Sequence, residues 1–275
     1  MIAITSPNNP KFKSALRLDS SRGRKQQGRF PIHGVRELLR AFGAALEFTE
    51  VFVCQDLLNG ADLGVIEDTC LQKNIPGFAL PLDLFRRLAY GDRQDGVVAI
   101  AIRPDVSLEQ LKLPTNSTFV MVVEGLEKPG NLGAVARSAD GAGAAALISA
   151  NPQTDFYHPN SIRASLGTVL TLPVAEGSST DVFEWLNANE FRIYSAIVGA
   201  GKVLWEANFA PRSAIVLGNE ANGLGPTWTG KGVTGISLPM KGVADSLNIS
   251  NTAAILAYEV ARQRFVQARG DGGSS

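Results

Sequence analysis

The sequence predicts an α/β fold made of two domains, and three observations support this. First, its 275 residues exceed one average domain and fit two modest ones. Second, short apolar runs typical of buried strands alternate along the chain with segments that have apolar residues at helical spacing. Third, a polar stretch with a proline near each end, residues 104–117, separates two such series. We therefore expect domains at 1–103 and 118–269 and a short tail at 270–275.

The first domain contains four clear elements. Val35–Phe42 has apolar positions at helical spacing, and Glu50–Cys54 is typical of a strand. A second helix is expected at Asp62–Lys73, ending before Pro76. The continuous apolar run Gly96–Ile102 indicates a strand that is covered on both faces.

The second domain repeats the alternation from a buried strand at Phe119–Val123 to a long last helix at Ser250–Ala268. The apolar residues of that helix form one broad face, which indicates that it packs against a core. Between these two elements we expect helices at Leu132–Asp140 and Asp181–Ala188, and strands at Ala145–Ile148, Leu172–Val174, Phe191–Val198, Ala214–Leu217 and Ile236–Leu238.

Composition excludes several classes of protein. With 45% hydrophobic and 19% charged residues the chain is an ordinary globular one, not a disordered one. No apolar run is long enough to span a bilayer, and the first ten residues lack the pattern of a signal peptide. We therefore expect a cytoplasmic protein with no membrane partner.

The cysteines and histidines point away from metal chemistry. Cys54 and Cys70 have apolar neighbours, which predicts buried, reduced thiols. His33 and His158 are too few for a histidine-rich zinc site, and neither CxxC nor HExxH spacing is present. We expect no metal site.

Positive charge is concentrated near the N-terminus, although the whole chain has a net charge of zero. In residues 1–40, nine basic residues face two acidic ones, a net charge of plus seven. Residues 20–29 contain almost no apolar side chain and are expected to form an exposed basic loop. Such a loop is suited to a phosphate backbone, and a solvated surface without a partner is the alternative.

Three polar loops that contain glycine lie beside the ends of predicted strands in the second domain. Residues 124–133 open the helix that carries Arg137, with Asn131 expected as its N-cap. Residues 218–226 place Glu220 among glycines, where a carboxylate has no role in forming the turn. The third loop is 239–252, and its serines and asparagines could bind a polar ligand or only cap the last helix.

Gly141–Ala146 matches the G-x-G-x-x-A pattern of dinucleotide binding, but it follows a helix and precedes a strand. That order is the reverse of the one the fingerprint requires, so a nucleotide-dependent oxidoreductase is disfavoured.

Taken together, the three loops resemble the three motifs of the SpoU (TrmH) family of RNA ribose 2'-O-methyltransferases. The matching stretches are residues 131–139, 217–224 and 237–250. In the first domain, residues 6–11, 28–34 and 96–99 resemble the L30e-like RNA-binding domain that precedes the catalytic domain in many members, with His33 where many have glutamate.

The resemblance implies a C-terminal α/β trefoil knot, a smaller L30e-like domain before it, and a homodimer formed through the knot domain. It also implies S-adenosylmethionine as cofactor, held by Ala196, Gly218, Asn219, Glu220, Gly223, Ile236, Leu238, Pro239, Ser246, Leu247 and Asn248. The implied catalytic residues are Arg137, Asn131, Glu220, Ser246 and Asn248. Arginine is effectively always protonated, so a role for Arg137 in holding phosphate and stabilising an oxyanion stands beside the role of general base.

RNA is the implied partner, ribosomal RNA in preference to transfer RNA. The candidate RNA contacts are Arg22, Arg24, Lys25, Arg29, Lys128 and Arg163. The alternatives are a ribose or base methyltransferase of the same superfamily that acts on transfer RNA, and a non-catalytic RNA-binding protein. Ribose and base methylation are separated by mass spectrometry of the digested RNA.

Overall fold

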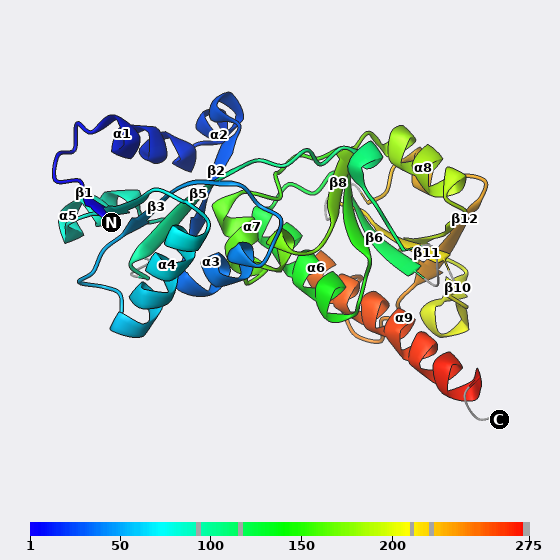
Figure 1. The fold of residues 1–275 in the computed structure, drawn as a ribbon. Helices are drawn as coiled ribbons and strands as arrows, with labels where there is room; N and C mark the ends of the chain where they lie inside the picture. The colour runs from blue at the N-terminus through cyan, green and yellow to red at the C-terminus, as the bar shows by residue number, and fades with distance from the viewer. Residues whose placement is uncertain (92–94, 115–117, 210–211, 220–222, 272–275) are drawn as a thin grey trace. The chain divides into compact units, whose positions relative to one another are not determined.

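In the computed structural model, residues 1–91, 95–114, 118–209, 212–219 and 223–271 are described. The chain forms two compact units, and each is built on its own sheet (Figure 1). The first unit contains Met1–Pro104 together with Tyr157–Thr171, and the second contains Asp105–Phe156 and Leu172–Ser275. The segment Tyr157–Thr171 thus lies between two stretches of the second unit in sequence but belongs to the first in space.

The described strands of the first unit form a mixed five-stranded sheet in the order β1-β4-β3-β5-β2. β5 pairs antiparallel with both β3 and β2, and the other pairs are parallel. The strands are β1 (Ile2–Ala3), β2 (Arg29–His33), β3 (Phe48–Val53), β4 (Gly77–Ala79) and β5 (Val97–Ile102). The helices are α1 (Pro10–Leu16), α2 (Ser21–Gln27), α3 (Val35–Phe42), α4 (Gly60–Gln72), α5 (Leu82–Leu88) and α7 (Pro159–Ala164), with 3-10 turns η1 (Arg17–Asp19) and η3 (Thr168–Leu170).

The prediction of an exposed basic loop at residues 20–29 is wrong. Ser20 caps a short helix, α2, by accepting a hydrogen bond from the Gly23 amide, and Gly28 ends it with a φ of 60°. Serine at the N-cap and a left-handed glycine at the end are the ordinary signals of a helix. The prediction of a loop gave these two signals less weight than the high content of basic residues.

The second unit has a sheet of seven described strands, all parallel, in the order β10-β12-β9-β11-β6-β7-β8. The strands are β6 (Thr118–Glu124), β7 (Ala146–Ala150), β8 (Val174–Gly177), β9 (Arg192–Ala196), β10 (Lys202–Val203), β11 (Arg212–Leu217) and β12 (Val233–Ser237). The helices are α6 (Pro129–Gly141), α8 (Ser179–Ala188) and α9 (Ile249–Asp271), with 3-10 turns η2 (Leu108–Gln110), η4 (Leu204–Glu206) and η5 (Pro226–Trp228).

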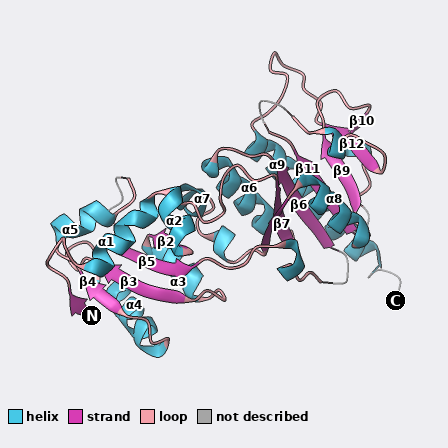
Figure 2. Ribbon diagram, turned by 90° about the horizontal axis from the view of Figure 1, so that it is seen from above, coloured by secondary structure: helices cyan, strands magenta, loops and turns pink. Residues whose placement is uncertain are grey.

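Helices cover both faces of this sheet (Figure 2). On one face, Val120 and Val122 of β6 share a core cluster with Val182 of α8 and Trp228 of η5. On the other face α9 packs against α6 and β11, and the guanidinium of Arg264 in α9 lies 5.0 Å from the ring centroid of Phe119. Every residue of β6 is buried, as its continuous apolar sequence predicts for a strand covered on both sides.

The family resemblance predicts an α/β fold, and both units have one, the second on a fully parallel sheet. Within the part of the chain that the structure describes, no helix is both long and apolar enough to cross a membrane.

Candidate functional site

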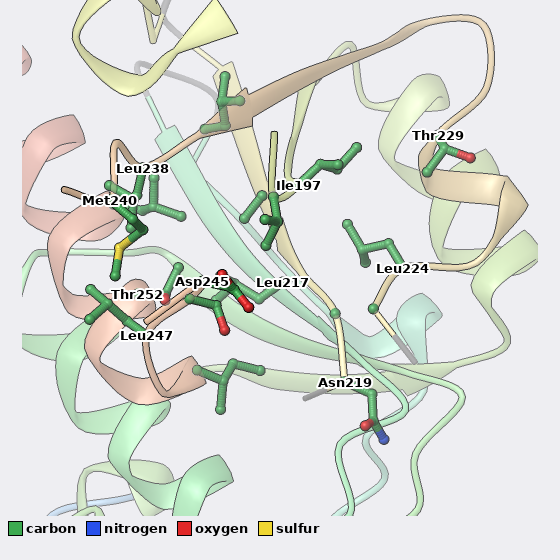
Figure 3. A pocket seen from close by; sticks show the side chains of 18 residues that line it. Ile197, Leu217, Asn219, Leu224, Thr229, Leu238, Met240, Asp245, Leu247 and Thr252 are labelled. Carbon is green, nitrogen blue, oxygen red and sulfur yellow. The ribbon is translucent and has the colours of Figure 1, made fainter. Parts of the chain in front are cut away.

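A cavity of about 430 Å³ lies in the second unit where β9, β11 and β12 end (Figure 3). These strands contribute Ala196, Leu217 and Ile236 to its wall. Ligands of parallel α/β sheets bind outside the carboxyl ends of the strands, and cavities of about 300–1,000 Å³ are typical of small-molecule sites.

Most of the residues that the resemblance assigned to the cofactor line this cavity. They come from strand ends and from the second and third loops, and they are Ala196, Gly218, Asn219, Gly223, Ile236, Leu238, Ser246 and Leu247. Pro239 is exposed and is not among the lining residues, although Leu238 and Met240 on either side of it are. Asn248 also does not line the cavity, and Glu220 lies outside the described residues.

The second loop folds back on itself at two glycines. The backbones of Asn219 and Gly223 exchange hydrogen bonds of 3.1 and 2.9 Å, and Gly223 has a φ of 67°. A Cβ on Gly218 would lie 2.4 Å from the carbonyl group of Gly223, closer than real atoms approach. The glycines therefore permit a close approach of two backbone segments that form part of the cavity wall.

Two polar side chains hold this loop to the chain that leaves β6. Asn219 donates from Nδ2 to the carbonyl oxygen of Gly125 (2.8 Å) and to Oε1 of Glu127 (3.2 Å). The Gly225 amide donates to Oε2 of Glu124 over 2.8 Å. Both ends of the second loop are thus anchored to the first residues of the first loop.

Glu124 is 9% exposed, and its carboxylate belongs to a hydrogen-bond network. The Ser179 hydroxyl donates to its Oε1 over 2.6 Å, and Asn151 donates from Nδ2 to the same serine oxygen over 2.7 Å. A buried carboxylate costs stability unless it is hydrogen-bonded, and here both of its oxygens are. Glu124 is not among the site residues predicted from the sequence, although an acidic residue at the end of an otherwise apolar, buried strand is a signal for such a role.

The polar residues of the third loop have two different roles, one at the cavity and one at the start of α9. Ser246 lines the cavity. Asn248 precedes α9, and its Oδ1 accepts hydrogen bonds from the Ser250 amide (2.9 Å) and hydroxyl (2.6 Å), which is a capping arrangement. Sequence reasoning missed Asp245, which also lines the cavity and stands directly before Ser246.

The helix after the first loop begins earlier than expected. α6 starts at Pro129 with Lys128 at the N-cap position, so the prediction that Asn131 is the N-cap is wrong. The fixed φ of proline favours the first helical position, which moves the helix start upstream. Asn131 is half-buried in the first turn and Arg137 is exposed. Neither residue lines the cavity of this single chain, and Arg137 has no hydrogen bond or ion pair with any described residue.

The candidate RNA contacts fall into two groups. Arg22, Lys25, Lys128 and Arg163 are exposed. Arg24 is 3% exposed and donates to the carbonyl oxygens of Leu18 (3.1 Å) and Asp19 (2.9 Å).

Arg29 is bound in the same way, within its own unit. Its guanidinium pairs with Glu50 (3.0 Å) and also donates to the Ser14 hydroxyl and to Gln27. Both guanidinium groups thus make their contacts within the first unit.

The fold and the cavity define an α/β protein with a cavity of small-molecule size at the carboxyl edge of a parallel sheet. Residues 118–258 match the SpoU rRNA Methylase family, and the chain belongs to that family. Residues 9–99 match the MRM3-like substrate binding domain.

Three comparisons illustrate the relationship. The crystal structure of an RNA 2'-O ribose methyltransferase is 36% identical, with a TM-score of 0.82 over 96% of this chain and 100% of that one. The 23S rRNA (uridine(2479)-2'-O)-methyltransferase of Streptomyces viridochromogenes is 34% identical over 62% of this chain and 61% of its own. The SpoU methyltransferase AviRb from the same organism, in complex with the cofactor AdoMet, is 25% identical, with a TM-score of 0.82 over 94% of this chain and 99% of that one.

Proposed function

We propose that this protein transfers a methyl group from S-adenosylmethionine to the 2'-hydroxyl of a ribose in ribosomal RNA. The observation that carries the proposal is the cavity at the ends of β9, β11 and β12, in a chain of the SpoU family. Relatives that methylate 2'-hydroxyl groups support the ribose, and the 23S rRNA methyltransferase supports the class of RNA.

The cavity fits the cofactor by its chemistry. The apolar side chains of Leu217, Ile236, Leu238 and Leu247 provide walls for an adenine ring, and Gly218 and Gly223 form part of the lining without a side chain of their own. When bound, S-adenosylmethionine supplies an electrophilic methyl group.

The residues of this chain must orient a weak nucleophile, the ribose hydroxyl, and help its proton to leave. In the proposal, Ser246 contacts the reaction centre from the cavity wall, and Asn131 orients Arg137 or the RNA. Arg137 holds a phosphate and stabilises the developing oxyanion, because a guanidinium stays protonated at neutral pH. Glu220 remains a prediction, since it lies outside the described residues.

The proposal includes a homodimer and a trefoil knot in the second unit. Arg137 does not line the cavity of its own chain, so a second copy close to the cavity is a reasonable source of the arginine. An exposed apolar stripe on α9, with Tyr258 56% and Phe265 58% exposed, supports a partner surface on that helix. The packing of α9 on α6 and β11 is compatible with a chain that threads back through the second loop.

RNA recognition is assigned to the exposed basic residues, and the place of action to the cytoplasm. Arg22, Lys25, Lys128 and Arg163 are exposed cations suited to phosphate contacts. The buried, free thiols of Cys54 and Cys70 fit a reducing compartment.

The test is transfer of labelled methyl from S-adenosylmethionine to unmodified ribosomal RNA and, separately, to unmodified transfer RNA. We expect label in ribosomal RNA, 2'-O-methylated nucleosides after nuclease digestion and mass spectrometry, and little label with Arg137→Ala.

Label in transfer RNA alone, or on a base, would replace the proposed substrate with one of the alternatives. RNA binding without any cofactor binding would identify a non-catalytic RNA-binding protein.

A further inference from the structure

The cofactor cavity contains a negative charge in an otherwise neutral lining. Among the described residues that line it, Asp245 is the only one with an ionisable side chain. The others are glycines, apolar side chains, or neutral polar ones such as Asn219 and Thr252. Figure 3 shows Asp245 near the middle of the pocket, between Leu217 and Leu247 in this view.

A negative charge at this point distinguishes the two forms of the proposed cofactor. S-adenosylmethionine has a sulfonium, an ammonium and a carboxylate, so its net charge is plus one. After methyl transfer the sulfur is a neutral thioether, and the product, S-adenosylhomocysteine, has a net charge of zero. A carboxylate in the wall attracts the first and gains nothing from the net charge of the second.

We infer that Asp245 is a specificity-determining residue that favours the cationic methyl donor over the neutral thioether product. This inference rests on the proposed function, because it needs the cavity to bind S-adenosylmethionine. Specificity is a difference between two affinities. The two ligands differ by one unit of charge, so the Asp245 carboxylate binds them with different affinities. Its consequence for the reaction is easier release of the product.

The expected effect is moderate. Asp245 is exposed, so water and salt screen its interaction with a ligand. We expect the neutral variant Asp245→Asn to bind S-adenosylmethionine about fivefold more weakly, an effect of the size expected for a partly screened ion pair. Affinity for S-adenosylhomocysteine should change less than about twofold, because that ligand has no net charge for the carboxylate to attract.

The experiment is calorimetric titration of the full chain with three ligands: S-adenosylmethionine, S-adenosylhomocysteine and sinefungin, an analogue with an amine in place of the methyl sulfonium. Sinefungin should follow S-adenosylmethionine, because it has the same net charge. Asp245→Glu retains the charge and should retain the preference. Asp68→Asn removes an exposed aspartate from α4 of the first unit and should change no affinity.

The outcomes separate this inference from the proposed function. If the wild-type protein binds the three ligands and Asp245→Asn weakens all equally, or none, the inference is overturned and the proposed function stands. If the wild-type protein binds none of them, both are overturned. Selective weakening of the two cationic ligands, reduced in 1 M salt, supports the inference.

Discussion

At the scale of single residues, Glu124 offers the sharpest test of how the second loop is held. Its replacement by leucine leaves the Gly225 amide and the Ser179 hydroxyl without their carboxylate acceptor. We expect Glu124→Leu to lower the free energy of unfolding by about 2–4 kcal/mol and to weaken cofactor binding at least tenfold. Chemical denaturation and calorimetric titration measure the two effects.

Ser179→Ala is the matched control for that prediction. It removes the other hydrogen bond of the same carboxylate but leaves the Gly225 contact in place. We expect a loss of about 1–2 kcal/mol in stability with nearly unchanged cofactor affinity. Equal loss of affinity in both variants would show that Glu124 acts through general stability and not through the loop.

The raised pKa of Cys70 leads us to expect that the free energy of unfolding decreases at alkaline pH. Burial raises the pKa of this thiol from 9.0 to about 11, with a smaller contribution from Glu67. Because the pKa is higher in the folded chain, the unfolded chain loses its proton first as pH rises. The contribution to stability is complete below pH 9 and is lost towards pH 11.

We therefore expect Cys70→Ala to lose less stability than the wild-type protein between pH 9 and pH 11, by about 2 kcal/mol. Urea denaturation at both pH values, repeated for each protein, measures this difference. Identical losses would place the alkaline sensitivity elsewhere.

At the scale of elements, the second loop depends on the absence of a side chain at one position. Gly218→Ala places a Cβ 2.4 Å from the Gly223 carbonyl group, so one of the two backbone segments must move. We expect cofactor affinity to fall at least tenfold. Gly60→Ala in α4 is the control, because nothing lies within 4 Å of the added carbon, and it should leave affinity unchanged.

The helix α2 contains basic residues of two kinds, the exposed Arg22 and Lys25 and the buried Arg24. The double variant Arg22→Gln with Lys25→Gln removes two exposed charges, and we expect weaker RNA binding with a shallower salt dependence, by about one to two units of log–log slope. Its melting temperature should not change. Filter binding across a salt series tests this.

Arg24→Gln is the counterpart within the same helix. Because the Arg24 guanidinium bonds to the carbonyl oxygens of Leu18 and Asp19, its loss should lower stability by about 1–2 kcal/mol. A variant of Arg24 that weakened RNA binding without any loss of stability would contradict this structural role.

The predicted elements succeeded where a hydrophobic run or period was long. The continuous apolar sequences of β5 and β6 and the apolar face of α9 were recognisable because burial itself selects those residues. Short elements were missed, among them β10 with two residues and β4 with three, because such segments contain too few residues to show a period.

At the scale of the whole molecule, Tyr157 belongs to the first unit although the strands that flank it in the sequence belong to the second. Its ring lies 4.4 Å from that of Phe30, and Arg103 lies over it at 5.8 Å, so the residue supports the first unit. We expect Tyr157→Ala to destabilise that unit by about 3 kcal/mol.

Hydrogen exchange measures where this effect appears. Amides of β2 should exchange faster, while those of β7 and β8, which flank Tyr157 in the sequence, should change little. Leu71→Ala, at an exposed position on α4 of the same unit, is the control. Faster exchange in β7 and β8 instead would mean that Tyr157 supports the second unit.

The amino-acid sequence is sufficient to predict the α/β class, the order of the main elements, the family and the polar loops that line the cavity. These follow from local patterns, because burial periodicity and glycine-containing motifs are written in consecutive residues. The folded structure was needed to show that Glu124 and Asn219 anchor the second loop, that Arg24 and Arg29 are held within the first unit, and that Tyr157–Thr171 belongs to that unit. Apart from those of Arg24, whose partners Leu18 and Asp19 are near it in sequence, these contacts join residues far apart in the chain, and a single sequence contains no local signal for them.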